Sequence, residues 1–219
     1  MTEKTRDDVN PHIIIVTGYL AAGKSTFARR LSEAVNIPCI IKDTFKIALC
    51  ESVSIISREE SSRFSAVTFD GMMYVTERLM ETGQSIIIEG NFAPAGLKKV
   101  EEAGVIKRLI DQYACQSLTY KFAGDTRLLH KRYIDRDKLP ERGQANAMYS
   151  DISYDEFDRV CHNLDGFNVG GEVVKVDTTD FSTVNFDHYI ETAQKFLGIM
   201  DKNSSLTSPV IEIIRGKRH

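Results

Sequence analysis

Short apolar runs alternate with amphipathic stretches along most of this chain. HIIIVT at 12–17, IPCIIKD at 37–43 and SIIIEG at 85–90 are nearly continuous apolar runs rich in β-branched residues. Runs of this kind are typical of strands buried on both faces, as in a parallel sheet. SLTYKF at 117–122 and EVVKVDTT at 172–179 predict two further strands. We therefore expect five strands.

Between these runs, apolar residues recur at the spacing of a helix. After the first run the pattern is clearest at Phe27, Leu31 and Val35. The remaining helices are expected over 57–83, 95–112, 126–143 (with a break at Pro140) and 186–198. Because strands and helices alternate, the sequence predicts a doubly wound α/β fold, in which ligands bind beyond the carboxyl ends of the strands.

The length of 219 residues fits one large domain, since domains average about 150 residues. We expect a flexible arm over 1–11, a single domain over 12–199 and a C-terminal tail over 200–219. No internal repeat, low-complexity tract or linker divides the chain.

Composition excludes several classes of protein. An apolar fraction of 42% with only 14 Gly and 5 Pro is that of a globular protein, not of a disordered or collagen-like one. The net charge of −3 gives no overall attraction to nucleic acid or to an anionic membrane surface. No apolar stretch approaches the roughly 20 residues of a membrane span, and none at the N-terminus has the length of a signal sequence. We expect a cytoplasmic protein without a membrane partner.

The segment GYLAAGKS at 18–25 matches the phosphate-binding pattern G-x-x-x-x-G-K-[ST] at every position. It lies between a predicted strand and a predicted helix, where backbone N–H groups and the helix N-terminus can face phosphate oxygens. Lys24 is expected to reach the β- and γ-phosphates, and Ser25 to offer its hydroxyl to Mg²⁺. The expected nucleotide-binding residues are Gly18, Ala21, Ala22, Gly23, Lys24, Ser25 and Thr26.

Two carboxylates close the second and third apolar runs. Asp43 is expected at the end of a strand, where it can accept the proton of a substrate hydroxyl while Lys46, one turn on, balances charge. Its alternative role is to cap the following helix. Glu89 is a candidate for holding Mg²⁺ or contacting the phosphate acceptor, and Asn91 for hydrogen bonding to polar ligand atoms. The alternative for Glu89 is a polar strand end on a surface loop.

The segment 126–143 carries six basic residues, which are Arg127, Lys131, Arg132, Arg136, Lys138 and Arg142. Arg132 and Arg136 are four residues apart and share a helix face, so they can close over a triphosphate. A solvated helix face with ion pairs to Asp135 and Glu141 is the alternative. A nucleic-acid groove is a third reading, but the segment lacks the interleaved aromatic residues that stack on bases.

These features together resemble the small P-loop kinases of the zeta-toxin, chloramphenicol phosphotransferase and polynucleotide 5′-hydroxyl kinase group, often catalogued as AAA-family ATPases. The resemblance extends over about residues 12–180 and includes the spacing Asp43-x-x-Lys46 and the strand IIIEGNF. It implies a P-loop NTPase fold, with a five-stranded parallel sheet in the order 2-3-1-4-5 flanked by helices. It also implies a helical, arginine-rich lid over about 126–150.

The resemblance further implies roles for single residues. Asp43 matches the base that activates the acceptor hydroxyl, and Lys46 replaces an arginine of the group, which weakens bidentate phosphate contact. Arg132, Arg136 and Arg142 correspond to lid arginines, and Arg127 resembles the residue near the adenine or the bound phosphates. Many relatives carry an R-H-x-G-H-like stretch after the lid, where this chain reads LPERGQANAMYSD. The identity of the acceptor is therefore not inherited.

The function expected from the sequence is that of an ATP- and Mg²⁺-dependent kinase acting on a hydroxyl of a small molecule, such as a sugar nucleotide, an antibiotic or a metabolite. Catalysis is assigned to Lys24, Asp43, Arg132 and Arg136, and acceptor binding to Asp43, Lys46, Glu89, Asn91 and Arg142. Ser25 and Glu89 are the expected metal ligands. Two alternatives stay open: an ATP-sensing module without catalysis, and a kinase for polynucleotide 5′-hydroxyls. The oligomeric state is not predicted.

Overall fold

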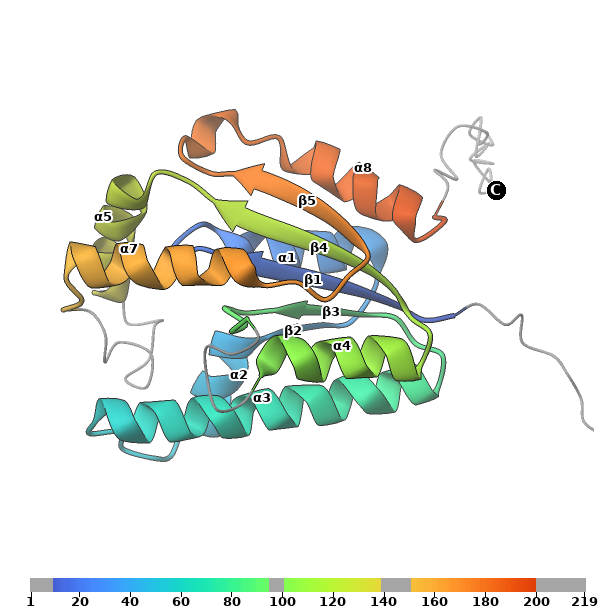
Figure 1. The fold of residues 1–219 in the computed structure, drawn as a ribbon, viewed down its shortest axis with the longest axis horizontal. Helices are drawn as coiled ribbons and strands as arrows, with labels where there is room; N and C mark the ends of the chain where they lie inside the picture. Colours follow the sequence, from blue (N-terminus) through green and yellow to red (C-terminus); the bar gives the residue numbers. More distant parts are fainter. Residues whose placement is uncertain (1–9, 95–100, 139–150, 200–219) are drawn as a thin grey trace, which may run out of the picture.

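The structure, a computed structural model, describes residues 10–94, 101–138 and 151–199, and a parallel β-sheet lies at its centre (Figure 1). The five strands are β1 (His12–Gly18), β2 (Cys39–Ile41), β3 (Ile86–Glu89), β4 (Gln116–Ala123) and β5 (Glu172–Asp177). Their order across the sheet is β2-β3-β1-β4-β5, and every pairing is parallel. The predicted fold class and strand order are confirmed.

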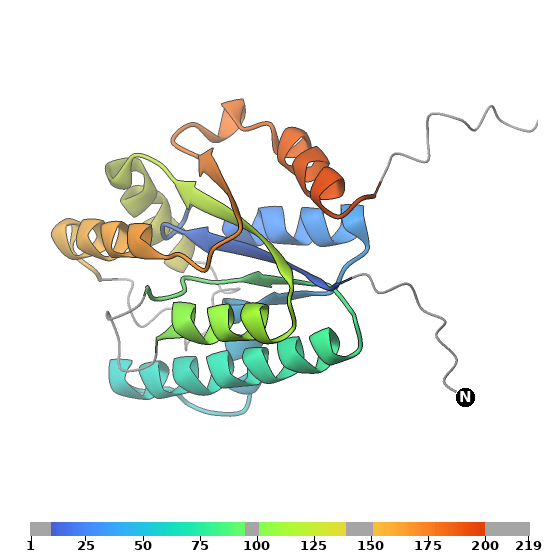
Figure 2. The same ribbon diagram turned by 45° about the vertical axis from the view of Figure 1, so that its right-hand side comes forward.

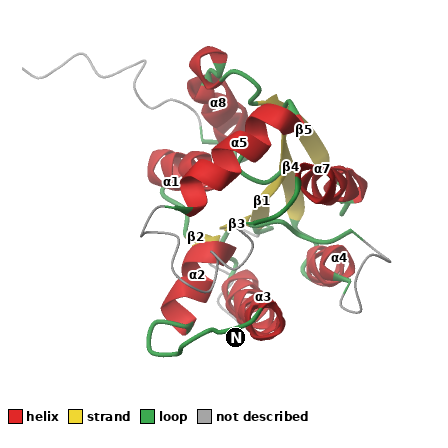
Figure 3. Cartoon of the chain, turned by 90° about the vertical axis from the view of Figure 1, so that its left-hand side faces the viewer, coloured by secondary structure: helices red, strands yellow, loops and turns green. Residues whose placement is uncertain are grey.

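Helices cover both faces of this sheet. They are α1 (Lys24–Val35), α2 (Lys42–Leu49), α3 (Arg58–Glu81), α4 (Glu102–Gln112), α5 (Thr126–Asp137), α7 (Tyr154–Asn163) and α8 (Phe186–Phe196), with short 3-10 turns at η2 (Leu164–Gly166) and η3 (Phe181–Thr183). α1 and α8 lie against one face and α3 and α4 against the other, as Figures 2 and 3 show. α5 and α7 lie at the end of the sheet toward which the strands point (Figure 1).

The central strand β1 explains why the apolar runs are continuous. Successive side chains of a strand point to opposite faces, and both faces are covered here. Ile14 and Val16 belong to the core beneath α1 and α8, whereas Ile13 and Ile15 belong to the core beneath α3 and α4. β1 lies between β3 and β4 at the centre of the sheet. The loop that follows β1 therefore lies at the carboxyl ends of the central strands, at the point where the strand order reverses.

An aromatic cluster anchors α1 to the sheet. Phe27 is fully buried, and its ring centroid lies 5.0 to 6.4 Å from four other ring centroids, those of Tyr120, Phe122, Phe186 and Tyr189. Offset and edge-to-face contacts of this kind stabilise the core beyond the area that they bury. α1, which begins at Lys24, is thereby fixed relative to β4 and α8.

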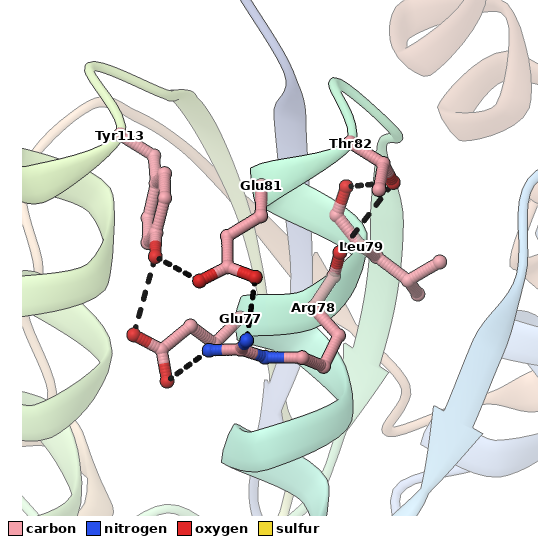
Figure 4. A network of polar contacts seen from close by, with 6 residues as sticks. All are labelled: Glu77, Arg78, Leu79, Glu81, Thr82 and Tyr113. Carbon is pink, nitrogen blue, oxygen red and sulfur yellow. Dashed lines mark hydrogen bonds and ion pairs between the residues drawn. The ribbon is translucent and has the colours of Figure 1, made fainter.

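At the other end of the sheet, a polar network joins the last turns of α3 and α4 (Figure 4). The Tyr113 hydroxyl donates to carboxylate oxygens of Glu77 and Glu81, each at 3.2 Å, and Arg78 forms an ion pair with Glu81 at 2.7 Å. These groups are partly exposed, and surface pairs contribute little free energy. We therefore assign this network a structural role remote from the ends of the strands where ligands bind.

The structure corrects the sequence-based description at two elements. The second strand spans only Cys39–Ile41, so the prediction that Asp43 ends a strand is wrong: Asp43 lies in the first turn of α2. The sequence predicted no helix between residue 143 and the strand expected from 172, yet α7 forms there. Its N-cap is Ser153, whose hydroxyl accepts the N–H of Glu156.

Parts of the predicted organisation lie outside the described residues. They are most of the N-terminal arm, the start of the helix expected from 95, the lid segment beyond 138 and the tail from 200. Within the described ranges, no helix combines the length and the apolar character needed to cross a lipid bilayer.

The Phe27 cluster generates a stability prediction. Phe27→Ala should lower the free energy of unfolding by about 3–5 kcal/mol, because truncating a buried aromatic ring removes its contacts and leaves a cavity. Val67→Ala, at a position of α3 that is 55% exposed, serves as the control and should change the value by less than about 0.5 kcal/mol. Urea unfolding measures both, and equal losses in the two variants would contradict the assignment of this core.

Candidate active site

The loop between β1 and α1 has a backbone that its two motif glycines make possible. Gly18 has φ +121° and Gly23 has φ +82°, values that residues with side chains rarely adopt. A Cβ on Gly18 would lie 2.1 Å from the carbonyl oxygen of Phe122, and one on Gly23 would lie 2.4 Å from the ring of Phe181. The loop is therefore wedged between β4 and the turn after β5, with no space for larger residues at either glycine.

Lys24, the first residue of α1, is buried within this loop at 6% exposure. Its Nζ donates hydrogen bonds to the carbonyl oxygens of Gly18 at 3.1 Å and Tyr19 at 2.6 Å. Burial lowers the pKa of Lys24 to about 8, and the Glu89 carboxyl counteracts part of that effect. The ammonium group is thus held at the loop, where the oxygens of a phosphate can take the place of its carbonyl partners.

Ser25 and Glu89 meet beside the lysine. The register of the sheet places Glu89, the last residue of β3, next to Val16 of β1, and the Ser25 hydroxyl donates to Glu89 Oε2 at 3.1 Å. Glu89 is only 4% exposed, and burial raises its pKa to about 7 although Lys24 acts in the opposite direction. The carboxyl group is therefore poised to exchange its proton for a cation near neutral pH.

The same pair fits a magnesium ion. A hydroxyl and a carboxylate are hard oxygen ligands, and Mg²⁺ in phosphate-binding sites is commonly held by one or two such groups together with phosphate oxygens. Among the residues that the structure describes, no cluster of three or more His, Cys, Asp or Glu side chains forms a separate metal site. By their chemistry and their contact, Ser25 and Glu89 could hold this ion.

A cavity of about 570 Å³ opens above the loop, between α1, α2, α5 and α7. It brings together most of the site residues that the sequence predicted, namely Ala21, Ala22, Gly23, Lys24, Ser25, Thr26, Asp43, Lys46, Glu89, Asn91 and Arg136. Gly18 lies at the neck of the loop instead of in the cavity wall. Residues far apart in the sequence therefore share one space beyond the carboxyl ends of the strands.

α2 supplies the wall opposite the phosphate-binding loop. Asp43 is half-buried in its first turn, and its charge raises the pKa values of both Lys24 and Glu89. Lys46, one turn on, is 4% exposed, and its Nζ donates to the Ser61 hydroxyl of α3 at 2.7 Å. Lys46 therefore ties α2 to α3 in addition to lining the cavity.

Asn91 lines the cavity just beyond β3. Its Oδ1 atom is buried and has no hydrogen-bond partner among the described residues. An amide oxygen that is removed from water without a donor is destabilising, so a buried one that borders a cavity is suited to receive a donor from a ligand or from water.

Two arginines that the sequence predicted for the site, Arg132 and Arg127, make contacts outside the cavity. Arg132 donates to the carbonyl oxygens of Thr178 and Thr179, both at 2.7 Å, and its guanidinium lies 4.6 Å from the ring centroid of Phe181. Arg127 stacks over Tyr154 at 4.5 Å.

Neither Arg127 nor Arg132 is among the described residues that line the cavity, so Arg136 is the one described basic residue of α5 that lines it. The third lid residue, Arg142, lies outside the described residues.

Sequence reasoning missed the contribution of α7. Its Glu156 and Val160 line the cavity, together with Ile152 before the helix and Tyr133 of α5. A signal for this helix was present, because Ser153-x-x-Glu156 matches the pattern of a capping box at a helix start. α7 also leads into Asp165 of η2, which accepts a hydrogen bond from the Tyr19 hydroxyl of the phosphate-binding loop at 3.0 Å.

Comparison with known proteins extends this description. No protein-family model matches the chain, and no curated protein sequence matches it. A proposed kinase from Chloroflexus aurantiacus J-10-fl is structurally similar, with a TM-score of 0.75 and 23% identity, over 85% of this chain and 98% of that one.

Two further solved structures are similar over nearly their whole length. One is a sugar kinase from Janibacter sp. HTCC2649, with a TM-score of 0.53 and 13% identity over 86% of this chain and 95% of that one. The other is a shikimate kinase from Bacteroides thetaiotaomicron, with a TM-score of 0.53 and 14% identity over 85% and 98%. With the sheet order and the glycine loop, these likenesses establish the P-loop NTPase fold.

The buried carboxyl of Glu89 predicts a pH dependence of stability. Its pKa rises from the ordinary value of 4.5 to about 7 in the folded protein. Between these two values the folded state holds more protons than the unfolded state, so stability falls as pH rises. Glu89→Gln should remove this slope, a difference on the order of 1–3 kcal/mol across the window.

Urea unfolding at a series of pH values from 4.5 to 7 measures this effect. Glu33→Gln, at an exposed position of α1, is the matched control and should leave the wild-type slope unchanged. Parallel curves for wild type and Glu89→Gln would contradict the prediction.

Proposed function

We propose that this protein is an ATP- and Mg²⁺-dependent kinase that transfers the γ-phosphoryl group to a hydroxyl of a small molecule. One observation carries the proposal: Asp43 lines the same cavity as Lys24, on the wall that faces the phosphate-binding loop. A carboxylate opposite the lysine is placed for an acceptor hydroxyl, which binding of ATP alone does not require. The sugar kinase and the shikimate kinase with the same fold are consistent with this class of reaction.

Nucleotide binding rests on the loop and on Lys24. The backbone N–H groups at the start of α1 and the positive end of the helix dipole favour phosphate oxygens. Lys24 would exchange its carbonyl partners for oxygens of the β- and γ-phosphates, which also restores a charged partner to a buried ammonium group. Thr26, the next residue after the motif, is exposed at the cavity mouth on the side where the α-phosphate would lie.

Ser25 and Glu89 would hold the metal ion. Mg²⁺ bound there supplies positive charge to the phosphate oxygens. For this role Glu89 must lose its proton, and its raised pKa of about 7 makes that loss easy near neutral pH once a cation arrives.

Asp43 would accept the proton of the acceptor hydroxyl. The hydroxyl oxygen forms a bond to the γ-phosphorus while the bond from that phosphorus to the β,γ-bridging oxygen breaks, and ADP leaves. Arg136 lines the cavity on the α5 side and would stabilise charge on the transferring group. Asn91 Oδ1 would accept a hydrogen bond from a second donor on the acceptor, which favours a molecule with more than one hydroxyl or amino group.

Transfer of label from γ-labelled ATP to a library of sugars, sugar nucleotides, antibiotics, metabolites and 5′-hydroxyl oligonucleotides tests the proposal. The wild-type protein should label at least one hydroxylated compound. Lys24→Ala should weaken ATP binding by at least about tenfold, or about 1.4 kcal/mol. Asp43→Asn should bind ATP as the wild type does and lose roughly 10²- to 10⁴-fold in transfer, the usual contribution of a general base.

Asp70→Asn, at an exposed position of α3, is the control for Asp43→Asn and should behave like the wild type. Calorimetry with Mg²⁺ and ATP reports binding separately from transfer. Tight binding of ATP without labelling of any compound would favour a nucleotide sensor over a kinase. Labelling only of oligonucleotide 5′-ends would identify a different acceptor class, and no heat with ATP would overturn the proposal as a whole.

A further inference from the structure

A buried ion pair lies next to the two segments that carry the cavity residues Asp43 and Asn91. Lys42 Nζ donates to Glu102 Oε1 at 2.5 Å, and the two side chains are only 11% and 5% exposed. The ammonium group also lies 5.3 Å from the ring centroid of Phe69 and 5.8 Å from that of Phe92. Neither Lys42 nor Glu102 is among the described residues that line the cavity. The pair therefore does not belong to the ligand-binding surface itself.

The pair nevertheless connects the elements that carry two cavity residues. Lys42 directly precedes Asp43 at the start of α2. Glu102 uses its second oxygen, Oε2, to accept the backbone N–H of Ala93 at 2.6 Å, two residues after Asn91. The wall that holds Asp43 and the loop that holds Asn91 are thus joined through one carboxylate.

The stem of Lys42 makes a second connection to the same loop. A Cβ placed on Gly90 would lie 3.1 Å from Lys42 Cβ, so the lysine stem packs directly against the Gly90 backbone. Gly90 in turn donates its N–H to the carbonyl oxygen of Val16 in β1 at 3.1 Å. This contact therefore fixes the position of α2 relative to the central strand β1.

Helix stability does not account for a lysine at this position. Residue 42 is the first of α2, and a cation at a helix N-terminus is opposed by the helix dipole. A buried ion pair is in general no more stabilising than a well-packed apolar pair of similar volume, because both charges lose their hydration. What the pair provides instead is a fixed geometry, since the carboxylate of Glu102 has defined partners on both of its oxygens.

The two helices that the pair joins, α2 and α4, both lack a side-chain cap at the N-terminus. The N-cap of α2 is Ile41 and that of α4 is Glu101, and neither side chain makes a capping hydrogen bond. The strand before α2 has only three residues and lies at the edge of the sheet. The position of Asp43 therefore depends on contacts made from α2 itself, which include this ion pair and the hydrogen bond from Lys46 to Ser61 of α3.

We infer that Lys42 and Glu102 are positioning residues, which set Asp43 and Asn91 relative to each other and thereby align the acceptor hydroxyl. This inference rests on the proposed kinase function for its catalytic consequence, but its structural content can be measured without a known acceptor.

The double variant Lys42→Met/Glu102→Gln tests it on the full-length protein. Glutamine keeps an oxygen for the N–H of Ala93, and methionine keeps the apolar stem, so the variant buries no unpaired charge. Its urea midpoint should stay close to that of the wild type. Hydrogen exchange should rise about tenfold or more at the hydrogen-bonded amides 45–49 of α2 and at those of Gly90 and Ala93, whereas amides of the loop 18–25 should keep wild-type exchange.

The kinetic readout is transfer from γ-labelled ATP to the acceptor found in the library. The double variant should lose about 100-fold in kcat, the scale expected for a misplacement of about 1 Å, with an unchanged KM for ATP. Lys107→Met/Asp111→Gln is the matched control, since it removes an exposed ion pair from the same helix α4. It should change neither exchange at these segments nor kcat.

Unchanged exchange at both segments would overturn the inference, whether or not the protein is a kinase. A rise in exchange throughout the chain, with a proportional fall in urea midpoint, would also overturn it, because that is the behaviour of a merely structural pair. If the double variant does not fold, Glu102→Asp keeps the charge but shortens its reach, and the same local pattern is required of it. Failure of the wild type to bind ATP would refute the kinase function and leave the exchange result decisive for the pair.

Discussion

The site depends on the burial of two opposite charges where the central strands end. Lys24 and Glu89 are both almost fully removed from water, and burial pushes the pKa of each toward neutrality, lowering that of the lysine to about 8 and raising that of the carboxyl to about 7. Water does not stabilise the charged form of either buried group, so a bound partner of opposite charge would stabilise the ammonium of Lys24 and the carboxylate of Glu89. In the proposed function, a metal-bound triphosphate would supply both partners at once, an anion for Lys24 and a cation for Glu89.

The sheet forces these two groups together. The strands and the loop that carry them follow from local sequence, whereas the strand order was implied by the resemblance to small P-loop kinases. The isoleucine runs predict fully buried parallel strands, and the motif at 18–25 predicts a loop whose glycines allow φ values of +121° and +82°. β1 and β3 are paired so that Val16 lies beside Glu89. This register places the loop that follows β1 next to the carboxylate at the end of β3. The fold, and the meeting of the loop at 18–25 with Glu89, were therefore predictable.

The wall of the cavity opposite this loop, which is the acceptor side of the proposed kinase, was less predictable because long-range contacts decide its structure. Asp43 was expected on a strand, but β2 is so short that the chain has entered α2 by that residue. Arg132 and Arg136 share a helix face, as their spacing requires. Only the structure shows that Arg132 donates its hydrogen bonds to backbone carbonyl groups that follow β5. The pairing of Lys42 with Glu102 joins residues 60 positions apart, and no periodicity in the sequence marks it.

This difference has a physical origin that bears on specificity. The nucleotide side is built from backbone geometry, which leaves few sequences able to form it, as the absence of space for a Cβ at Gly18 and Gly23 shows. The acceptor side is built from side chains on α2, α5 and α7, each positioned by its own contacts to neighbouring helices. Such contacts can be exchanged in pairs without disturbing the phosphate-binding loop. For the proposed kinase, one scaffold can thus keep the phosphate-binding loop fixed while the acceptor changes, so the motif at 18–25 indicates phosphate binding and the acceptor has to be determined from the opposite wall.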